Sequence, residues 1–568
     1  MTELGVTGGA VGIVLEGEIV YLGGFGVRDV ESKAPVDANT VFRVGSVSKT
    51  ITALAIMRLR DEGKVVLDAP AATYVPALRS LEPPTRDSPP ITVRHLLTMT
   101  SGLGYDDLWG AVTFGYDDAQ LARFLARGLS FAGAAGERYR YSNLGFALLG
   151  KVVENASGKA FGEYIAGNVF GPLGMRSSGF VTSGMPAEQR AVGYYRDGDR
   201  LVAEPVPSDG VFAPAGGVYT SLSDFARYAA SHLAAYPPRD DAETGVVRRS
   251  TLREMHAGQA WARWSEDMPV LGRDPDGSPS LSAMSYGLGW AQNTTCLAEA
   301  MVQHGGFEPG YYASIRLLPR QGLGVVVLST TENLGQLRTF EALVGLLREG
   351  GVLEAPPRPA SPALVTARDA VIRLLERWDA GLLAETFDPL TQRYSFVRKF
   401  REEFARMGRD HGRCRPDGEI VPSGLTQGRF RLVCERGAVE FVVFLTPGVP
   451  PVVQMVEWRE ELPAAETERT MASKLVAALG RDTVLPPELV AASADRSALE
   501  KRLARLRGTF GACELAEPPW NDGMGKVTAR LRCESAALNL SFRLEPKTSL
   551  VVEVSGAQPR SFGAVCAE

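Results

Sequence analysis

The sequence is short of lysine, histidine and cysteine, and each shortage limits what the chain can do. Only ten of its 61 basic residues are lysine, so a motif that requires lysine is hard to meet by chance. Five histidines and six cysteines in 568 residues show no spacing typical of a metal site, and no cofactor is expected. The basic residues are scattered and the net charge is −5, which argues against nucleic acid as a partner.

Long apolar runs are also missing. No run reaches the ~18 residues that a transmembrane helix needs, and residues 1–5 lack the charged and apolar regions of a signal peptide. The composition, with 45% hydrophobic and 22% charged residues, is that of a folded globular protein. A chain of 568 residues exceeds what one hydrophobic core usually serves, so two or more domains are expected.

Residues 1–354 alternate strand-like and helical stretches, which predicts a domain of mixed α and β structure. Residues 10–22 predict a hairpin of buried strands, and residues 313–329 predict a second hairpin. Residues 51–62 predict a helix, with a glycine placed directly after it to end it. Strands are therefore expected at both ends of this domain, with helices between them.

The rest of the chain predicts a duplication. A proline-rich linker, 355–363, separates the first domain from two α+β modules, 364–462 and 463–560. Neither module shows a catalytic motif, so they could shape substrate access, bind a cell-envelope ligand or support assembly. A shift of 99 positions aligns the two modules without a gap at Gly412 and Gly511, Cys414 and Cys513, Cys434 and Cys533, and Pro447 and Pro546.

Ser46 and Lys49 are the first candidates for chemistry, because they precede and enter the helical stretch at 51–62. If a helix begins at Ser46, Lys49 shares its face and reaches its hydroxyl. A lysine with a depressed pKa can take the proton from a serine and make it a nucleophile. The alternative for an isolated S-x-x-K is a capping serine followed by a solvated lysine.

Two further segments carry candidate residues. Tyr141 and Asn143 precede an apolar helical stretch, where the phenol could relay protons and the amide could orient the substrate or Lys49. The alternative is a packed tyrosine beside an asparagine that caps the helix. His304 is followed by two glycines at the start of an apolar strand, and these glycines would let a substrate backbone approach closely.

Together these segments resemble the serine β-lactamase and penicillin-binding-protein superfamily, whose motifs are S-x-x-K, Tyr-x-Asn and Lys-Thr-Gly or a variant. The resemblance also covers residues 91–103, 171–175 and 214–221, and so nearly all of residues 1–350. It implies an α/β (α+β) domain of the β-lactamase/transpeptidase type, with an antiparallel sheet and a helical region. It also implies that Ser46, Lys49 and Tyr141 are the catalytic residues.

Within the superfamily, the chain is most similar to the branch with class C β-lactamases, D-aminopeptidases, DD-peptidase-like proteins and esterases. The resemblance implies an acyl-enzyme on Ser46, an oxyanion hole made by the N–H groups of Ser46 and Phe307, and substrate contacts at Asn143 and at the segment His304, Gly305, Gly306 and Phe307. No metal site is expected.

A histidine replaces the motif lysine that holds the substrate carboxylate in true β-lactamases. His304 is largely neutral at pH 7 if its pKa is ordinary, so an ester or peptide substrate is favoured over a β-lactam. The substrate is expected to be a small molecule or peptide, with the cell envelope as one source. A β-lactamase proper and a catalytically idle ligand-binding protein of the same fold remain alternatives, and the oligomeric state stays open.

The cysteines of the two modules predict disulfides, Cys414 to Cys434 and Cys513 to Cys533. In an antiparallel hairpin, residues equidistant from the turn face each other at a distance that a disulfide spans. The alternative is buried free thiols in a cytoplasmic protein. Disulfides persist mainly in oxidising compartments, so we expect an exported protein, periplasmic or extracellular, whose upstream helix and signal peptide are missing from this sequence.

Overall fold

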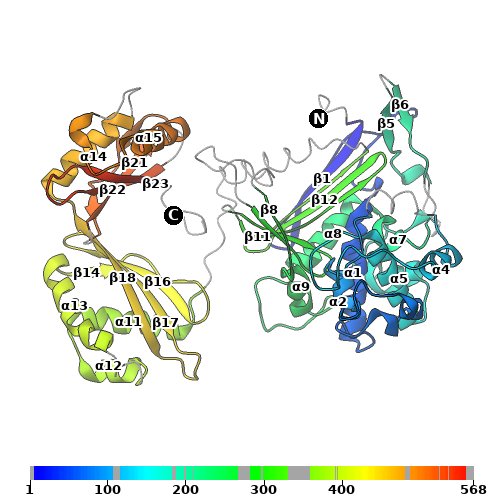
Figure 1. Cartoon of the computed structure of the whole chain (residues 1–568), viewed down its shortest axis with the longest axis horizontal. Coiled ribbons are helices and arrows are strands. Elements are labelled where there is room, and N and C mark those ends of the chain that lie inside the picture. Colours follow the sequence, from blue (N-terminus) through cyan, green and yellow to red (C-terminus); the bar gives the residue numbers. More distant parts are fainter. Residues whose placement is uncertain are drawn as a thin grey trace. The chain divides into compact units, whose positions relative to one another are not determined.

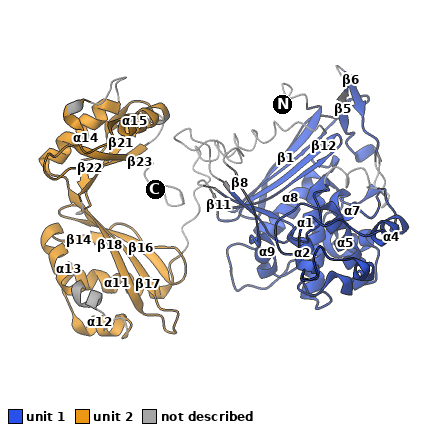
Figure 2. Cartoon of the chain, in the orientation of Figure 1, with its two compact units in different colours: residues 1–272, 279–355, 562–566 blue, residues 273–278, 356–561, 567–568 orange. Residues whose placement is uncertain are grey.

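The computed structural model of the chain forms two compact units, which Figure 2 shows in different colours. The first is built mainly from residues 1–272 and 279–355, and the second mainly from residues 356–561. In the described part of the chain, no helix has the length and apolar character needed to span a membrane. The structure describes residues 6–557 outside these segments: 107–114, 182–186, 198–199, 207–208, 266–281, 296–297, 331–358, 390–391, 393–394, 480–485, 523–524 and 535–536.

An antiparallel sheet forms the scaffold of the first unit (Figure 1). Its strands lie in the order β3-β2-β1-β13-β12-β11-β10-β9-β8, so the first strands of the chain pair with the last strands of the unit. β12 and β13 are buried at every position, which shows that both faces of the sheet are covered there. The bounds are β1 Gly8–Leu15, β2 Glu18–Asp29, β3 Ala34–Pro35, β8 Ala260–Ser265, β9 Ser282–Tyr286, β10 Ala291–Thr295, β11 Ala298–Glu308, β12 Tyr311–Leu318 and β13 Leu323–Ser329.

Both hairpins that the sequence predicted are present, but the prediction of buried strands is wrong for β2, which has no buried residue and exposes Ile19, Val20 and Tyr21. β2 lies near the sheet edge, where only the two-residue strand β3 follows it. β1 pairs with β2 across a turn in which Glu16 and Gly17 have φ angles of 52° and 86°. Short hairpin turns need such left-handed conformations, and glycine adopts them at little cost. β12 pairs with β13, and β13 also pairs with β1, so the two hairpins lie side by side within the sheet.

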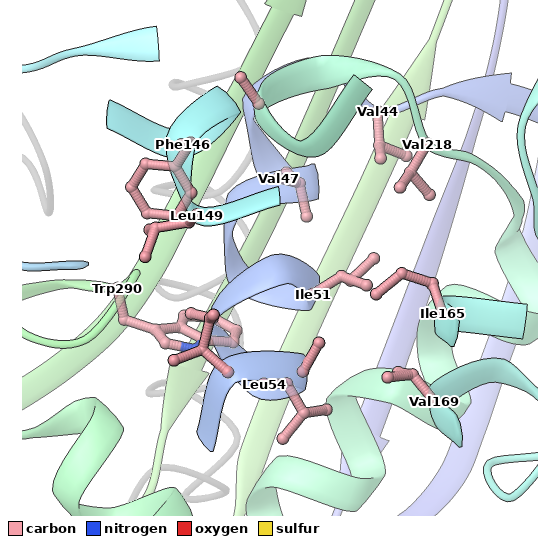
Figure 3. Close-up of a cluster of buried hydrophobic side chains, with 14 of the residues drawn as sticks. Val44, Val47, Ile51, Leu54, Phe146, Leu149, Ile165, Val169, Val218 and Trp290 are labelled. Carbon is pink, nitrogen blue, oxygen red and sulfur yellow. The ribbon is translucent and has the colours of Figure 1, made fainter. Parts of the chain in front are cut away.

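Helices surround α1, the helix that follows the candidate nucleophile. It begins at Ser48 rather than at residue 51, and Gly63 follows its end with a φ of 74°. Figure 3 shows Ile51 and Leu54 of α1 among buried side chains from other elements, which fixes α1 within the core. The helices of this unit are α1 Ser48–Asp61, α2 Val93–Leu97, α4 Asp118–Ala126, α5 Asn143–Ser157, α6 Phe161–Ile165, α7 Ala213–Gly216, α8 Leu222–Leu233 and α9 Arg249–His256.

The second unit has its own antiparallel sheet, with strands in the order β14-β16-β17-β18-β20-β21-β22-β23. It contains two separate hydrophobic cores, one within residues 364–456 and one within residues 464–554, and helices contribute to each. The bounds are α11 Pro362–Glu376, α12 Ala380–Thr386, α13 Ser395–His411, β14 Cys414–Pro416, β15 Val421–Pro422, β16 Gln427–Cys434, β17 Ala438–Leu445, β18 Val453–Pro463, α14 Glu466–Leu479, α15 Arg496–Phe510, β19 Cys513–Leu515, β20 Trp520–Asn521, β21 Lys526–Cys533, β22 Ala537–Leu544 and β23 Val551–Ala557.

Equivalent strands of the two halves of this unit have equivalent bounds. β16 and β21 both have eight residues, and so do β17 and β22. The starts of both pairs are 99 residues apart, since 526 minus 427 and 537 minus 438 agree. These bounds support the internal duplication, which stays a prediction. Within the expected linker, residues 355–358 lie outside the described residues, and Pro362 begins α11 at a position that proline tolerates.

Both predicted disulfides are present in the structure. Cys414–Cys434 joins β14 to β16, and Cys513–Cys533 joins β19 to β21. In each pair the two cysteines are direct partners in the strand register, with Cα atoms 3.9 Å and 4.0 Å apart. Such bonds persist mainly in oxidising compartments, so they are typical of an exported protein.

Removing either disulfide is expected to destabilise the second unit. Each bond closes a loop with a sequence separation of 20, and losing a cross-link of this size costs about 3 kcal/mol in the chain-entropy model. The double variants Cys414→Ser/Cys434→Ser and Cys513→Ser/Cys533→Ser should both show a lower thermal midpoint than the wild type. Peptide mapping without reductant checks the pairing, and free thiols at all four positions in secreted protein would contradict it.

A partly buried charge network stabilises the first module of this unit. Glu460 on β18 accepts hydrogen bonds from Arg406 and from His411, whose Nε2 atom lies 3.0 Å from the carboxylate. The other ring nitrogen of His411 lies 2.8 Å from the carbonyl oxygen of Arg436. Burial opposes ionisation of Glu460, but the hydrogen bonds from His411 and Arg406 outweigh it and lower the pKa of Glu460 from 4.5 to about 2.

Acid is therefore expected to weaken this module. Because the pKa of Glu460 is lower in the folded state, its contribution to stability is complete above pH 4.5 and is lost as the pH falls toward 2. By linkage, a shift of this size corresponds to roughly 3 kcal/mol. The difference in unfolding free energy between the wild type and Glu460→Gln, measured by denaturant titration, should shrink from about pH 5 to about pH 2. A difference that does not vary with pH would show that the charge of Glu460 is not responsible.

Candidate active site

Ser46 lies in a short 3₁₀ turn between β4 (Val41–Arg43) and α1. The sequence suggested that Ser46 begins the helix, whereas α1 starts two residues later. In the described stretch 40–57, Ser46 is the one residue that is not buried, so its hydroxyl is open to a substrate. Gly45 has a φ of 49°, and a Cβ added there would lie 2.9 Å from the backbone nitrogen of Phe307. Glycine therefore allows the turn to approach β11 closely.

Lys49 is fully buried and points toward the candidate nucleophile. Its Nζ atom donates hydrogen bonds to Ser46 Oγ at 2.9 Å and to the carbonyl oxygen of Ala215 at 2.8 Å. It also lies 4.8 Å from the centre of the Tyr141 ring. A solvated lysine, the alternative that the sequence left open, is therefore wrong. The amine is held within proton-transfer distance of the hydroxyl.

Tyr141 approaches the same hydroxyl from the segment before α5. Its Oη atom donates a hydrogen bond to Ser46 Oγ at 2.6 Å. Two groups that can carry protons, an amine and a phenol, therefore converge on one serine oxygen. Either of them, once deprotonated, is placed to accept the proton of Ser46 and later to return it to a leaving group.

The start of α5 is held by a carboxylate that the sequence did not reveal. Asp106 accepts hydrogen bonds from the backbone nitrogens of Asn143 at 2.6 Å and Leu144 at 2.8 Å, and from the Ser142 hydroxyl at 3.1 Å. Burial raises the pKa of Asp106, and the hydrogen bonds at the helix start oppose that rise. The capping residue of α5 is Ser142 rather than Asn143, whose side chain is buried. Asp106 thus anchors the segment that carries Tyr141.

His304 is buried beside the site and is uncharged. Its Nε2 atom lies 3.0 Å from the hydroxyl of Tyr286, and its Nδ1 atom lies 2.7 Å from the carbonyl oxygen of Gly305. Burial, and next the positive charge of Lys49, lower the pKa of His304 from 6.5 to about 3. The histidine is therefore neutral at pH 7, as expected. It lies in the second half of β11 and not at the start of a strand, because β11 already begins at Ala298.

The two glycines after His304 have different surroundings. A Cβ added at Gly306 would overlap the carbonyl oxygen of Val44 and lie 3.1 Å from the backbone nitrogen of Ser46. A Cβ added at Gly305 would meet no atom within 4 Å. Gly306 therefore allows close contact between β11 and the serine turn, whereas Gly305 faces the opposite side of the strand, because successive side-chain positions on a strand alternate in direction. Phe307 follows, with a side chain that is half exposed.

The structure brings residues of all three motifs together, since Lys49 and Tyr141 contact Ser46 Oγ and Gly306 packs against the turn that carries Ser46. In the described residues, no group of three or more histidine, cysteine or acidic side chains is arranged to hold a metal ion. The sequence missed Asp106, Tyr286 and the carbonyl of Ala215. Asp106 lies three residues after the segment 91–103 that carries the family resemblance, and this closeness was the one signal that could have indicated it.

Comparison with known proteins agrees with this arrangement. A family model described as Beta-lactamase matches residues 1–347. Esterase EstB of Burkholderia gladioli is 38% identical over 247 residues, which cover 40% of this chain and 60% of that protein. The putative penicillin-binding protein PbpX of Bacillus subtilis (strain 168) is 30% identical over 231 residues, which cover 40% of this chain and 55% of that protein. The chain thus spans less than two thirds of the length of these relatives.

A solved structure shows the same fold. The octameric penicillin-binding protein homologue from Pyrococcus abyssi aligns with 99% of this chain and 96% of that chain, with a TM-score of 0.51 and 20% sequence identity. The antiparallel sheet with its surrounding helices is therefore a β-lactamase/transpeptidase-like fold, extended by the sheet-rich second unit. Because the family model matches well over half of the residues, the chain belongs to the beta-lactamase family.

Proposed function

We propose that this protein is a serine hydrolase that cleaves ester or amide bonds through an acyl-enzyme on Ser46. The observation that carries the proposal is the convergence of Lys49 Nζ and Tyr141 Oη on Ser46 Oγ, at 2.9 Å and 2.6 Å. A binding protein gains nothing from a buried amine held against a hydroxyl, because burying the amine is costly. This argues against the catalytically idle alternative.

The proposed reaction has two halves. Ser46 Oγ attacks the carbonyl carbon while its proton passes to Lys49 or Tyr141, and the carbonyl oxygen becomes an oxyanion. The N–H groups of Ser46 and Phe307 would stabilise this oxyanion. The proton then goes to the leaving group as its bond to the acyl carbon breaks. Water hydrolyses the acyl-enzyme with the same groups acting in reverse, and no cofactor is needed.

An ester is the favoured substrate class. The position of the motif lysine holds His304, whose low pKa leaves no positive charge there for a substrate carboxylate at pH 7. An exposed aromatic side chain lies near the nucleophile at Tyr105, whose ring centre is 6.4 Å from that of Tyr141. These features suit an uncharged acyl group with apolar character, and one relative is named as an esterase. A peptide or cell-envelope substrate remains a second candidate.

The proposal is tested by incubating the protein with a fluorophosphonate, p-nitrophenyl esters, nitrocefin and D-amino-acid peptides. We expect an adduct on Ser46 by intact-mass and peptide analysis, and turnover of the esters well above that of nitrocefin. Turnover of nitrocefin equal to that of the esters would instead support a β-lactamase proper. Absence of both adduct and turnover would overturn the proposal. Secretion of protein expressed with its upstream codons tests the proposed export.

His304 is expected to set substrate preference and not to form the covalent bond. His304→Lys places a cation where the family motif has one, so kcat/KM should shift toward substrates that bear a carboxylate by about tenfold, as a charge-assisted hydrogen bond would give. The measurement is the ratio of kcat/KM for two esters that differ only in that carboxylate. His304→Gln is the uncharged control. A ratio that is the same in both variants would place His304 outside the recognition site.

A further inference from the structure

The oxyanion hole proposed above is made by two chain segments that are far apart in the sequence. Ser46 follows β4, whereas Phe307 lies near the end of β11. Only small displacements of one segment against the other are tolerable, because the donors of an oxyanion hole act over about 2.7–3.1 Å. Something must therefore fix the distance between the two segments.

An ion pair joins these segments next to the two donors. Arg43, the last residue of β4, lies three residues before Ser46, and Glu308 directly follows Phe307. Their side chains are 3% and 6% exposed, and Arg43 Nη1 lies 3.5 Å from Glu308 Oε2. The charges are almost completely removed from water, so their attraction is screened much less than that of a surface pair.

The same guanidinium also contacts the segment that holds Lys49. Arg43 Nε donates a hydrogen bond to the carbonyl oxygen of Gly216 at 3.3 Å, and the preceding residue, Ala215, accepts a hydrogen bond from Lys49 Nζ. One buried side chain thus links the strand before the nucleophile, the strand of the second oxyanion donor and the segment that orients the amine.

Glycines stand where the serine turn meets β11, so their own side chains do not set the distance between these two segments. A Cβ added at Gly45 would lie 3.0 Å from Glu308 Cγ, and a Cβ added at Gly306 would overlap the carbonyl oxygen of Val44. The two backbones therefore touch with no side chain of their own between them. The attraction between Arg43 and Glu308, which lie next to this contact, holds the two backbones at this distance.

We propose that the Arg43–Glu308 ion pair is a positioning clamp that sets the distance between the backbone N–H groups of Ser46 and Phe307. The inference rests on the acyl-enzyme function proposed above. Its alternative is a pair that merely stabilises the fold. A buried ion pair is poor at that, since well-packed apolar residues of similar volume are often as stabilising.

Glu308→Gln tests the clamp, because it keeps the shape of the side chain and removes its charge. The probe is a pair of substrates, an ester and the thionoester in which sulfur replaces the carbonyl oxygen. Sulfur is a weak hydrogen-bond acceptor, so the thionoester gains little from the oxyanion hole. We expect kcat/KM for the ester to fall about tenfold, mainly through a lower kcat. This is less than the ~10²-fold to 10³-fold loss caused by removing an oxyanion-hole donor, and kcat/KM for the thionoester should be nearly unchanged.

The ratio of the two kcat/KM values separates the two roles. A clamp lowers the preference for the oxygen ester, whereas a purely structural role lowers both substrates together and leaves the ratio as in the wild type. Glu254→Gln is the control, because it makes the same substitution in another ion pair of the same unit. That pair joins Arg60 and Glu254 at 2.8 Å and lies away from the oxyanion hole. It should leave the ratio unchanged.

Arg43→Gln is the second variant, in case Glu308→Gln does not fold. It removes the cation opposite Glu308 together with the planar fork that reaches both Glu308 and Gly216. The same fall in the ester-to-thionoester ratio is expected. An unchanged ratio in a folded, active variant would overturn the clamp alone. A wild type that neither turns over esters nor reacts with a fluorophosphonate would overturn the proposed function itself, so the two failures are distinguishable.

Discussion

Replacing Ser46 with alanine is expected to abolish ester turnover and covalent labelling and to leave the fold intact. The acyl-enzyme cannot form without Oγ, and loss of the nucleophile of a serine hydrolase lowers kcat by ~10⁴-fold or more. The fold should tolerate the change because Ser46 is partly exposed and lies in a turn, where its removal leaves no large cavity. Turnover is measured with p-nitrophenyl esters, and labelling with a fluorophosphonate by intact mass.

A control shows that the loss is chemical. Ser48 is the next serine along the chain, and its hydroxyl accepts a hydrogen bond from the backbone nitrogen of Val218 instead of facing the site. Ser48→Ala should therefore still be labelled and should turn over substrate, with at most a modest loss of stability. Normal turnover by Ser46→Ala would remove the central claim, whereas an equal loss in both variants would indicate a damaged fold.

The core of the candidate site could be predicted because its residues lie close together in the sequence or belong to recognisable motifs. Ser46 and Lys49 are three residues apart, and this spacing brings their side chains together both in a single helix and in a 3₁₀ turn followed by a helix. The predicted contact is therefore present although the predicted helix start was wrong. Tyr141 carried no such local signal. It was identified through its order in the chain and its motif, and the structure then placed it at the same oxygen.

The residues that hold the site were not predictable, because they act across large sequence separations. Asp106 binds the start of α5 some 37 residues away, and Arg43 of β4 meets Glu308 of β11 although β4 lies outside the large sheet that contains β11. An isolated arginine or aspartate in a sequence gives no sign of its partner. The hydrogen bond between Tyr286 and His304 was missed for the same reason, because β9 and β11 are brought together only by the strand order.

The disulfides show where long-range structure can be predicted. Cys414 and Cys434 are separated by one turn-rich segment, and the same separation recurs at Cys513 and Cys533. A local hairpin converts that spacing into a strand register, so the pairing followed without knowledge of the rest of the sheet. Each bond in fact joins a short strand to a longer one, and in the first module β15 also pairs with β16. The division of the first arm of this hairpin into the short strands β14 and β15 carried no clear signal in the sequence.

Removal of Lys49 is expected to have the second largest effect. Lys49→Ala deletes a buried amine that contacts both Ser46 Oγ and the carbonyl oxygen of Ala215, and a positioned acid–base group contributes about 10²–10⁴-fold to a rate. We expect a loss near the upper end of that range at pH 7, since the amine is fully buried and water does not readily replace it. The measurement is kcat/KM for ester hydrolysis, with thermal unfolding to confirm that the variant is folded.

Two further variants identify what Lys49 contributes. Lys49→Arg keeps a positive charge beside Tyr141, but a guanidinium does not give up its proton and therefore cannot act as a base. If Lys49 takes the proton of Ser46, Lys49→Arg is as inactive as Lys49→Ala, and Tyr141→Phe retains more activity than either. If Tyr141 is the base and Lys49 only supplies charge, Lys49→Arg retains part of the rate and Tyr141→Phe loses most of it. Normal activity in Lys49→Ala would contradict both assignments, because the 2.9 Å contact with Ser46 would then have no part in the reaction.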